Sequence, residues 1–157
     1  MNKFDIHNME KREKMLFSSL SAHADFMVIG DATDFIKKWA DSLGVEIHST
    51  ELQSIEDIRG ERVIVTNVST PYYYYKSWFS DVLDEVSGHI DKEHLILIYV
   101  DKADNRTINA LKFYMENKNP ENLFYGIICR DTKKKINSTI NGLCFIHIWE
   151  NDEDGNC

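Results

Sequence analysis

Two short turns in this 157-residue chain carry residues that could bind phosphate or a metal ion. The first turn starts at Gly30, directly after the apolar run Phe26 to Ile29, where a phosphate-binding loop would lie. The second turn starts at Asp101, after the apolar run Leu95 to Val100. An aspartate in that place could organise a magnesium ion, and a glutamate after it could polarise water. Both turns therefore have to be compared with the residue pattern that this chemistry requires.

The first turn lacks the pattern G-x-x-x-x-G-K-[ST]. Counted from Gly30, the second glycine is replaced by Phe35, the phosphate-binding lysine by an isoleucine, and the metal-binding hydroxyl by Lys37. The phenyl ring would prevent close approach of the backbone, and Asp31 and Asp34 would repel phosphate. We expect no nucleotide binding at this degenerate loop, whose residues we take as Gly30, Asp31, Thr33, Phe35 and Lys37.

The second turn has a lysine, Lys102, where the glutamate would stand. An ammonium group cannot accept a proton as a general base, so hydrolysis is not expected. The alternative is that Asp101 and Asp104 cap the helix that follows. We therefore predict no catalytic residue, no cofactor and no enzymatic activity.

Metal and nucleophile patterns are also absent from the sequence. The six histidines have neither H-x-x-x-H spacing nor a C-x-x-C companion, so a metal site is not expected; they are His7, His23, His48, His89, His94 and His147. Neither Cys129 nor Cys144 has a recognisable histidine partner, and Cys157 is terminal. We interpret the cysteines as reduced and structural.

An aromatic run is harder to explain by core packing. Four consecutive tyrosines precede two further aromatic residues, giving Tyr72, Tyr73, Tyr74, Tyr75, Trp78 and Phe79. This is more aromatic surface than the start of one helix can bury, and Tyr and Trp are favoured at protein interfaces. A protein interface and plain core packing both remain open. Stacking on nucleic acid is less favoured, because only Lys76 adds a local positive charge.

Apolar runs alternate with helical spacing along the chain, which predicts an α/β fold. Helical spacing follows Asn8, Phe35, Glu51, Pro71, Ile108 and Lys133, and the last helix candidate covers 133–140. The predicted strands cover 26–29, 45–47, 62–68, 94–100, 123–129 and 144–149. Continuous apolar strands joined by helices indicate a mostly parallel sheet with helices on both faces. Sites in such folds lie at the carboxyl ends of strands, here after Ile29, Val68, Val100 and Cys129.

Length and charge narrow the class of protein. The chain suits one core, with an N-terminal amphipathic helix in 1–22, the α/β domain in 23–149 and an acidic tail in 150–157. The net charge of −8 argues against direct binding to nucleic acid. No apolar run is long enough to span a bilayer and no signal core begins the chain, so we expect no membrane contact and a cytoplasmic location.

The stretch from His94 to Trp149 resembles the small AAA+ subunits of clamp loaders, particularly the bacterial delta-prime type. The resemblance rests on the order of its segments, which are Leu95 to Asp104, Ile108 to Leu111, Asn119 to Asn122, Leu123 to Cys129, Lys133 to Ile140 and Asn141 to Cys144. Phe26 to Ile47 is similar to the opening strand, loop, helix and strand of that family. The resemblance implies a P-loop NTPase or AAA+-like core, in which the sensor position falls near 130–132 and Leu143 replaces the trans-acting arginine.

That resemblance implies a role in DNA replication. Our first hypothesis is a non-catalytic AAA+-like adaptor that binds a replication protein, either a sliding clamp or a replisome ATPase. The alternative is an acidic, phage-type inhibitor that occupies a DNA-binding surface of such a protein. A weak nucleotide-binding ATPase is a third reading, and self-association through Tyr72 to Phe79 is also left open.

Overall fold

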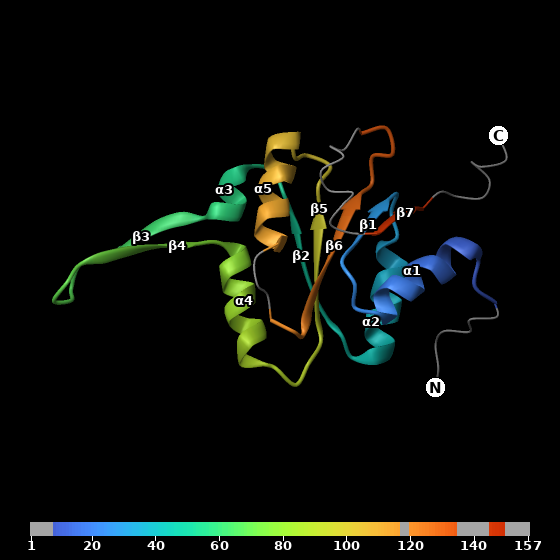
Figure 1. The fold of residues 1–157 in the computed structure, drawn as a ribbon, viewed down its shortest axis with the longest axis horizontal. Coiled ribbons are helices and arrows are strands. Elements are labelled where there is room, and N and C mark those ends of the chain that lie inside the picture. The colour runs from blue at the N-terminus through green and yellow to red at the C-terminus, as the bar shows by residue number, and fades with distance from the viewer. Residues whose placement is uncertain (1–7, 117–119, 135–144, 150–157) are drawn as a thin grey trace.

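The structure is a computed structural model that describes residues 8–116, 120–134 and 145–149. It has five parallel strands in one sheet, in the order β2-β5-β6-β1-β7, and a separate antiparallel hairpin, β3-β4 (Figure 1). The strands are β1 (Phe26–Ile29), β2 (Glu46–Glu51), β3 (Glu61–Val65), β4 (Tyr72–Lys76), β5 (His94–Tyr99), β6 (Leu123–Cys129) and β7 (Phe145–Ile148). The helices are α1 (Lys11–Ser21), α2 (Thr33–Leu43), α3 (Ile55–Arg59), α4 (Trp78–Gly88) and α5 (Asn105–Glu116). The predicted α/β class, with a mostly parallel sheet and helices on both faces, is confirmed.

The centre of the sheet is buried on both faces because its strands are apolar at nearly every position. In β5, Leu95 and Leu97 pack with α1 and α2, while Ile96 and Ile98 pack with α4 and α5. Successive side chains of a strand point to opposite faces, so one uninterrupted apolar strand contributes to two cores. Figure 1 shows the two helix layers on either side of the sheet.

Glycine at position 126 of β6 makes room for a large ring on the neighbouring strand. Gly126 lies in register with Phe26 of β1, and a β-carbon there would collide with the Phe26 ring. The absence of a side chain therefore lets Phe26 and Phe124 fill the core under α1 and α2.

Several predicted helices follow the expected signals. In α2, the buried residues Ile36, Trp39 and Ala40 recur at helical spacing, and Gly44 ends the helix in the left-handed region with φ of 70°. Helix α4 ends at Gly88. Helix α1 packs on the same core, since Leu16 and Leu20 are fully buried against α2 and the sheet.

One part of the predicted sheet is wrong. The apolar run predicted as a strand over 62–68 forms β3, but β3 pairs with β4 in the hairpin and not with the parallel sheet. The tyrosine run that the sequence placed before a helix is β4 itself, since aromatic residues favour the extended backbone and Pro71 precedes them. The loop after Val68 is consequently the tip of the hairpin and does not lie at the sheet edge.

Three predictions fall wholly or largely outside the described residues: the acidic tail in 150–157, the short helix over 133–140, and the segment Asn141 to Cys144. In the part of the chain that is described, no helix has the length and apolar character that crossing a bilayer would require.

We expect the double-sided burial of β5 to dominate stability. Replacing Leu97 with alanine should lower the free energy of unfolding by about 2 to 5 kcal/mol, because the buried methyl groups leave a cavity. Leu43, which is 62% exposed on α2, is the matched control, and its change to alanine should stay within about 0.5 kcal/mol. Urea unfolding followed by circular dichroism measures both values; equal losses would contradict the two-sided core.

Candidate functional site

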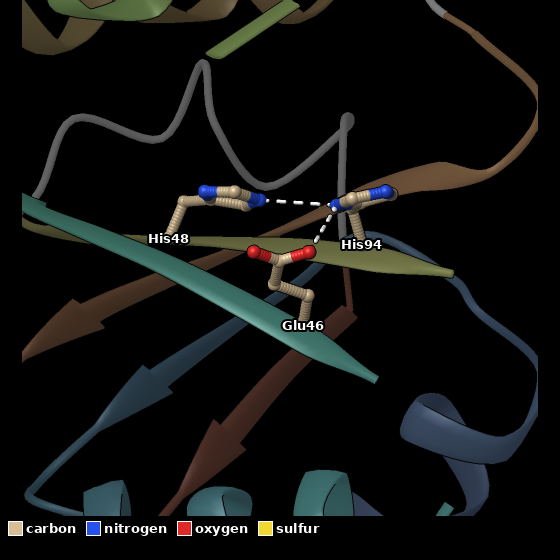
Figure 2. A group of neighbouring side chains, drawn as sticks. All are labelled: Glu46, His48 and His94. Atoms are coloured by element: carbon tan, nitrogen blue, oxygen red, sulfur yellow. Dashed lines mark hydrogen bonds and ion pairs between the residues drawn. The ribbon is translucent and has the colours of Figure 1, made fainter. Parts of the chain in front are cut away.

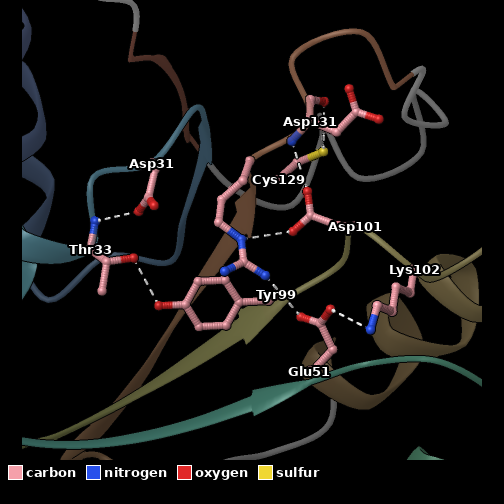
Figure 3. Close-up of polar contacts among 9 residues, drawn as sticks. Asp31, Thr33, Glu51, Tyr99, Asp101, Lys102, Cys129 and Asp131 are labelled. Carbon is pink, nitrogen blue, oxygen red and sulfur yellow. Dashed lines mark hydrogen bonds and ion pairs between the residues drawn. The ribbon is translucent and has the colours of Figure 1, made fainter.

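The carboxyl ends of the parallel strands bring four loops to one edge of the sheet, which we call the carboxyl edge. The loops follow β1, β2, β5 and β6, and their polar side chains meet in one network (Figure 3). Two of these loops are the turns that the sequence singled out, beginning at Gly30 and Asp101. The other two contribute Glu51 and Arg130, which spacing along the sequence could not connect.

The first loop is short and its backbone is committed to the sheet. Only Gly30 to Ala32 separate the end of β1 from the start of α2. The Gly30 N–H donates to the carbonyl of Cys129 at 2.8 Å, and Gly30 has φ of 123°, which favours glycine. A β-carbon at Gly30 would also collide with the carbonyl oxygen of Trp149. The loop is therefore shorter than the G-x-x-x-x-G spacing whose N–H groups surround a phosphate.

The remaining residues of the degenerate loop hold α2 in place. Asp31 accepts a hydrogen bond from the Thr33 N–H at 3.1 Å, one residue before Ala32, which is the N-cap of α2. The Thr33 hydroxyl lies 2.9 Å from the hydroxyl of Tyr99. Phe35 packs against Trp149 with ring centroids 5.4 Å apart, and Lys37 is exposed on the outer side of α2. These contacts give each of these residues except Lys37 a structural role.

Arg130 is the centre of the carboxyl edge. Its Nε donates to Asp101 at 3.1 Å, and one terminal nitrogen donates to Glu51 at 3.3 Å. Its guanidinium carbon lies 4.5 Å from the centre of the Tyr99 ring, a cation–π geometry. The hydrogen bond with Asp101 raises the pKa of the Arg130 guanidinium above its ordinary value. The positive charge of Arg130 is therefore held beside the acidic turn.

The other groups at this edge complete the charge balance. The Asp131 N–H donates to Asp101 at 2.8 Å, and the Lys102 ammonium lies 3.9 Å from Glu51. Burial, followed by the nearby Asp101 carboxylate, raises the pKa of the Cys129 thiol, which disfavours the nucleophilic thiolate. Asp101 and Glu51 are thus each held by a cation of the same chain, an arrangement suited to fixing loops together.

The capping interpretation of the second turn holds for one of its two aspartates. Asp104 accepts hydrogen bonds from the N–H and the hydroxyl of Thr107, at 2.8 and 2.7 Å, and so caps α5. These bonds lower the pKa of the Asp104 carboxyl. Asp101 does not cap the helix, because both of its oxygens bind the loop after β6.

The aromatic run forms a second candidate site, on the hairpin that projects away from the sheet (Figure 1). All four side chains are about half exposed, with values of 54, 59, 45 and 47% for Tyr72, Tyr73, Tyr74 and Tyr75. Trp78 is only partly exposed, and Phe79 is 1% exposed in the core beside α5. The six aromatic residues therefore do not lie together on one surface: Phe79 lies in the core, and the four tyrosines lie on the surface.

The hairpin also gathers positive charge that the sequence did not connect with the tyrosines. Arg62 lies over the Tyr73 ring with 5.3 Å from guanidinium carbon to ring centre, and Arg59 lies over Tyr75 at 5.9 Å. Tyr73 and Tyr75 contact each other edge to face at 6.1 Å. We call this side of the hairpin the Tyr73 face. Its arginines come from α3 and β3, so pairing of the two strands was needed to reveal them.

A third group of polar residues appears at the opposite, amino-terminal edge of the sheet. Glu46 and His48 of β2 meet His94 of β5, with potential ligand atoms all within 4.8 Å of one another (Figure 2). The prediction of no metal site relied on spacing within single segments. Because His48 and His94 are far apart in sequence and lie on adjacent strands, that test could not detect them.

Comparison with known proteins does not assign this chain to a family. No protein-family model matches the sequence, and no curated protein matches it at a significant level.

The Arg130 network predicts a specific salt dependence. Changing Arg130 to glutamine should lower the free energy of unfolding by about 1 kcal/mol or less in low salt, and the loss should shrink in high salt as the exposed charges are screened. Lys37→Gln removes an exposed cation from the same acidic chain and controls for net charge. Urea unfolding at two salt concentrations measures both variants. Identical behaviour of the two would mean that the Arg130 contacts contribute nothing beyond net charge.

Proposed function

We propose that this chain is a non-catalytic protein-interaction module with an AAA+-like α/β scaffold, and that it binds its partner through the β3-β4 hairpin. The observation that carries the proposal is the projection of the hairpin, with four half-exposed tyrosines, away from the sheet. A large aromatic surface on a projecting element is available to a partner and contributes little to the core.

The physical chemistry of the hairpin supports a binding role. A two-stranded ribbon alone is marginally stable in water, so contact with another surface would stabilise it. Its outer strand edges offer N–H and C=O groups to which a partner strand can add. Tyr and Arg are also the residues enriched where interfaces concentrate their binding energy, and the Tyr73 face carries both.

The carboxyl edge supports the absence of ATP chemistry. The loop from Gly30 to Ala32 is shorter than a phosphate-binding loop. Arg130 donates a hydrogen bond to Asp101, the carboxylate that would organise a metal ion in a nucleotide-binding site. Lys102 stands where a general base would be needed and pairs with Glu51. These contacts favour a scaffold over the weak nucleotide-binding ATPase.

The resemblance to clamp-loader subunits makes a replication protein the proposed partner, either a sliding clamp or a replisome ATPase. The local charge of the hairpin favours the adaptor over the acidic inhibitor. Arg59 and Arg62 lie over tyrosine rings, and Lys76 is paired with Asp81 at 2.8 Å, whereas an inhibitor that replaces DNA on a basic surface needs an acidic contact face. We therefore propose that the hairpin meets a neutral or acidic protein surface.

The hairpin proposal predicts a large effect of single tyrosine changes. Tyr73→Ala should weaken binding to the partner at least tenfold, because it removes an aromatic anchor and the ring beneath Arg62. Calorimetric titrations with purified sliding clamp and clamp-loader ATPase measure the affinity. Phe113→Ala on α5, where the ring is 71% exposed, is the matched control and should not change it.

Other occupants of the hairpin give distinct outcomes. Loss of binding in Phe113→Ala equal to that in Tyr73→Ala would remove the hairpin from the interface. Saturable binding of a single-stranded oligonucleotide that Tyr73→Ala abolishes would replace the protein partner with nucleic acid. A dimer in light scattering that Tyr73→Ala converts to a monomer would make a second copy the occupant.

The non-catalytic part of the proposal has its own test. Titration with a fluorescent ATP analogue and magnesium should give no saturable signal, because the short loop after β1 has no phosphate cradle. Saturable binding that weakens when Asp101 is changed to asparagine would revive the ATPase reading. Arg130→Gln should remain unable to bind, since removing the cation does not lengthen the loop.

A further inference from the structure

The polar cluster at the amino-terminal edge of the sheet combines two imidazoles and a carboxylate. His48 Nε2 lies 3.0 Å from His94 Nδ1, and Glu46 Oε2 lies 3.7 Å from the same His94 nitrogen. Figure 2 shows the Glu46 carboxylate and the His48 ring directed toward the His94 ring. The register of the parallel strands accounts for the meeting, since Glu46 pairs with His94 and His48 lies two residues further along β2.

The outer nitrogen of each imidazole faces a group that can only accept a hydrogen bond. His94 Nε2 lies 3.4 Å from the carbonyl oxygen of His89, and His48 Nδ1 lies 4.0 Å from the carboxylate of Glu85. These surroundings favour a hydrogen on both outer nitrogens. In neutral rings, the inner nitrogens His48 Nε2 and His94 Nδ1 then both carry lone pairs.

Two lone pairs and a carboxylate directed at one another repel unless a proton or a metal cation lies among them. Proteins that bind metal through histidine use this arrangement: the inner nitrogen binds the ion while a carbonyl or carboxylate holds the N–H of the outer one. A tetrahedral zinc site, with bonds of about 2.0 to 2.1 Å, separates its ligand atoms by about 3.3 Å. The observed separations of 3.0 and 3.7 Å lie on either side of that value.

We propose that Glu46, His48 and His94 bind a divalent first-row transition-metal ion, with zinc as the best match. Two imidazoles and one carboxylate suit zinc, whereas magnesium and calcium prefer oxygen ligands throughout. Glu85 and the His89 carbonyl orient the two rings and are not ligands. Three protein ligands leave a further coordination position for water or for a group from a partner.

Burial and position define what this ion does. His94 is fully buried, while the Glu46 side chain is 37% exposed and offers a route from solvent. The ion joins β2, the edge strand of the sheet, to its neighbour β5. It cross-links the two strands at the end of the sheet opposite the Arg130 network, and its three protein ligands lie outside the hairpin.

Cobalt(II) provides a direct test, because its visible absorption reports tetrahedral coordination. The metal-free full-length chain, prepared with a chelator, is titrated with cobalt(II) and then with zinc chloride. We expect one equivalent of cobalt to give the intense tetrahedral bands and zinc to displace it. Glu46→Gln should weaken cobalt binding at least tenfold, because loss of a ligand lowers metal affinity at least as much as loss of a group that orients a ligand. His48→Gln should abolish the tetrahedral bands.

The control is a second histidine and glutamate pair on the same chain. His23 Nδ1 lies 3.5 Å from Glu93, with no third ligand among the described residues, so Glu93→Gln should bind cobalt as the unchanged chain does. Circular dichroism of the metal-free variants shows whether each still folds. A purely octahedral cobalt spectrum, or an equal loss in Glu93→Gln and Glu46→Gln, would overturn the proposal and identify the cluster as a hydrogen-bonded histidine pair. Magnesium chloride at the same concentration should not compete, and competition by it would also overturn the assignment.

Discussion

Double-sided burial of the parallel sheet is the constraint from which the other features follow. Strands β5 and β6 are apolar at nearly every position, and their backbone groups are satisfied by neighbouring strands. When helices cover both faces of a sheet, polar and charged side chains reach solvent mainly at the two ends of its strands. The carboxyl edge holds the Arg130 network, and the amino-terminal edge holds the cluster of Glu46, His48 and His94.

The carboxyl edge shows how side chains of this chain join the loops that follow four parallel strands. Carboxylates that converge at strand ends repel one another and need a counter-charge. Here Arg130 supplies it to Asp101 and Glu51, and its stacking on Tyr99 links the network to Thr33 at the start of α2. The ends of β1, β2, β5 and β6 are therefore joined by side chains.

The hairpin does not share the constraint of the sheet. It has only two strands, its four tyrosines are about half exposed, and its cross-strand contacts are aromatic and cation–π interactions. Such a ribbon gains little from the core and is free to vary in sequence without disturbing it. Proteins commonly carry recognition residues on surface segments that a packed scaffold positions.

The sequence by itself determined the elements whose signals are local. The apolar runs fixed β1, β5 and β6, and helical spacing with a terminal glycine fixed α2 and α4, because burial pattern and capping are properties of neighbouring residues. Tertiary structure decided everything that joins distant segments. The tyrosine run is an exposed strand because β4 pairs with β3. The sequence did not predict this strand, because the residues that follow it have helical spacing. Strand order brought Arg130 to Asp101 and His48 to His94, residues that no spacing rule connects, since contacts between strands depend on register across the sheet and not on distance along the chain.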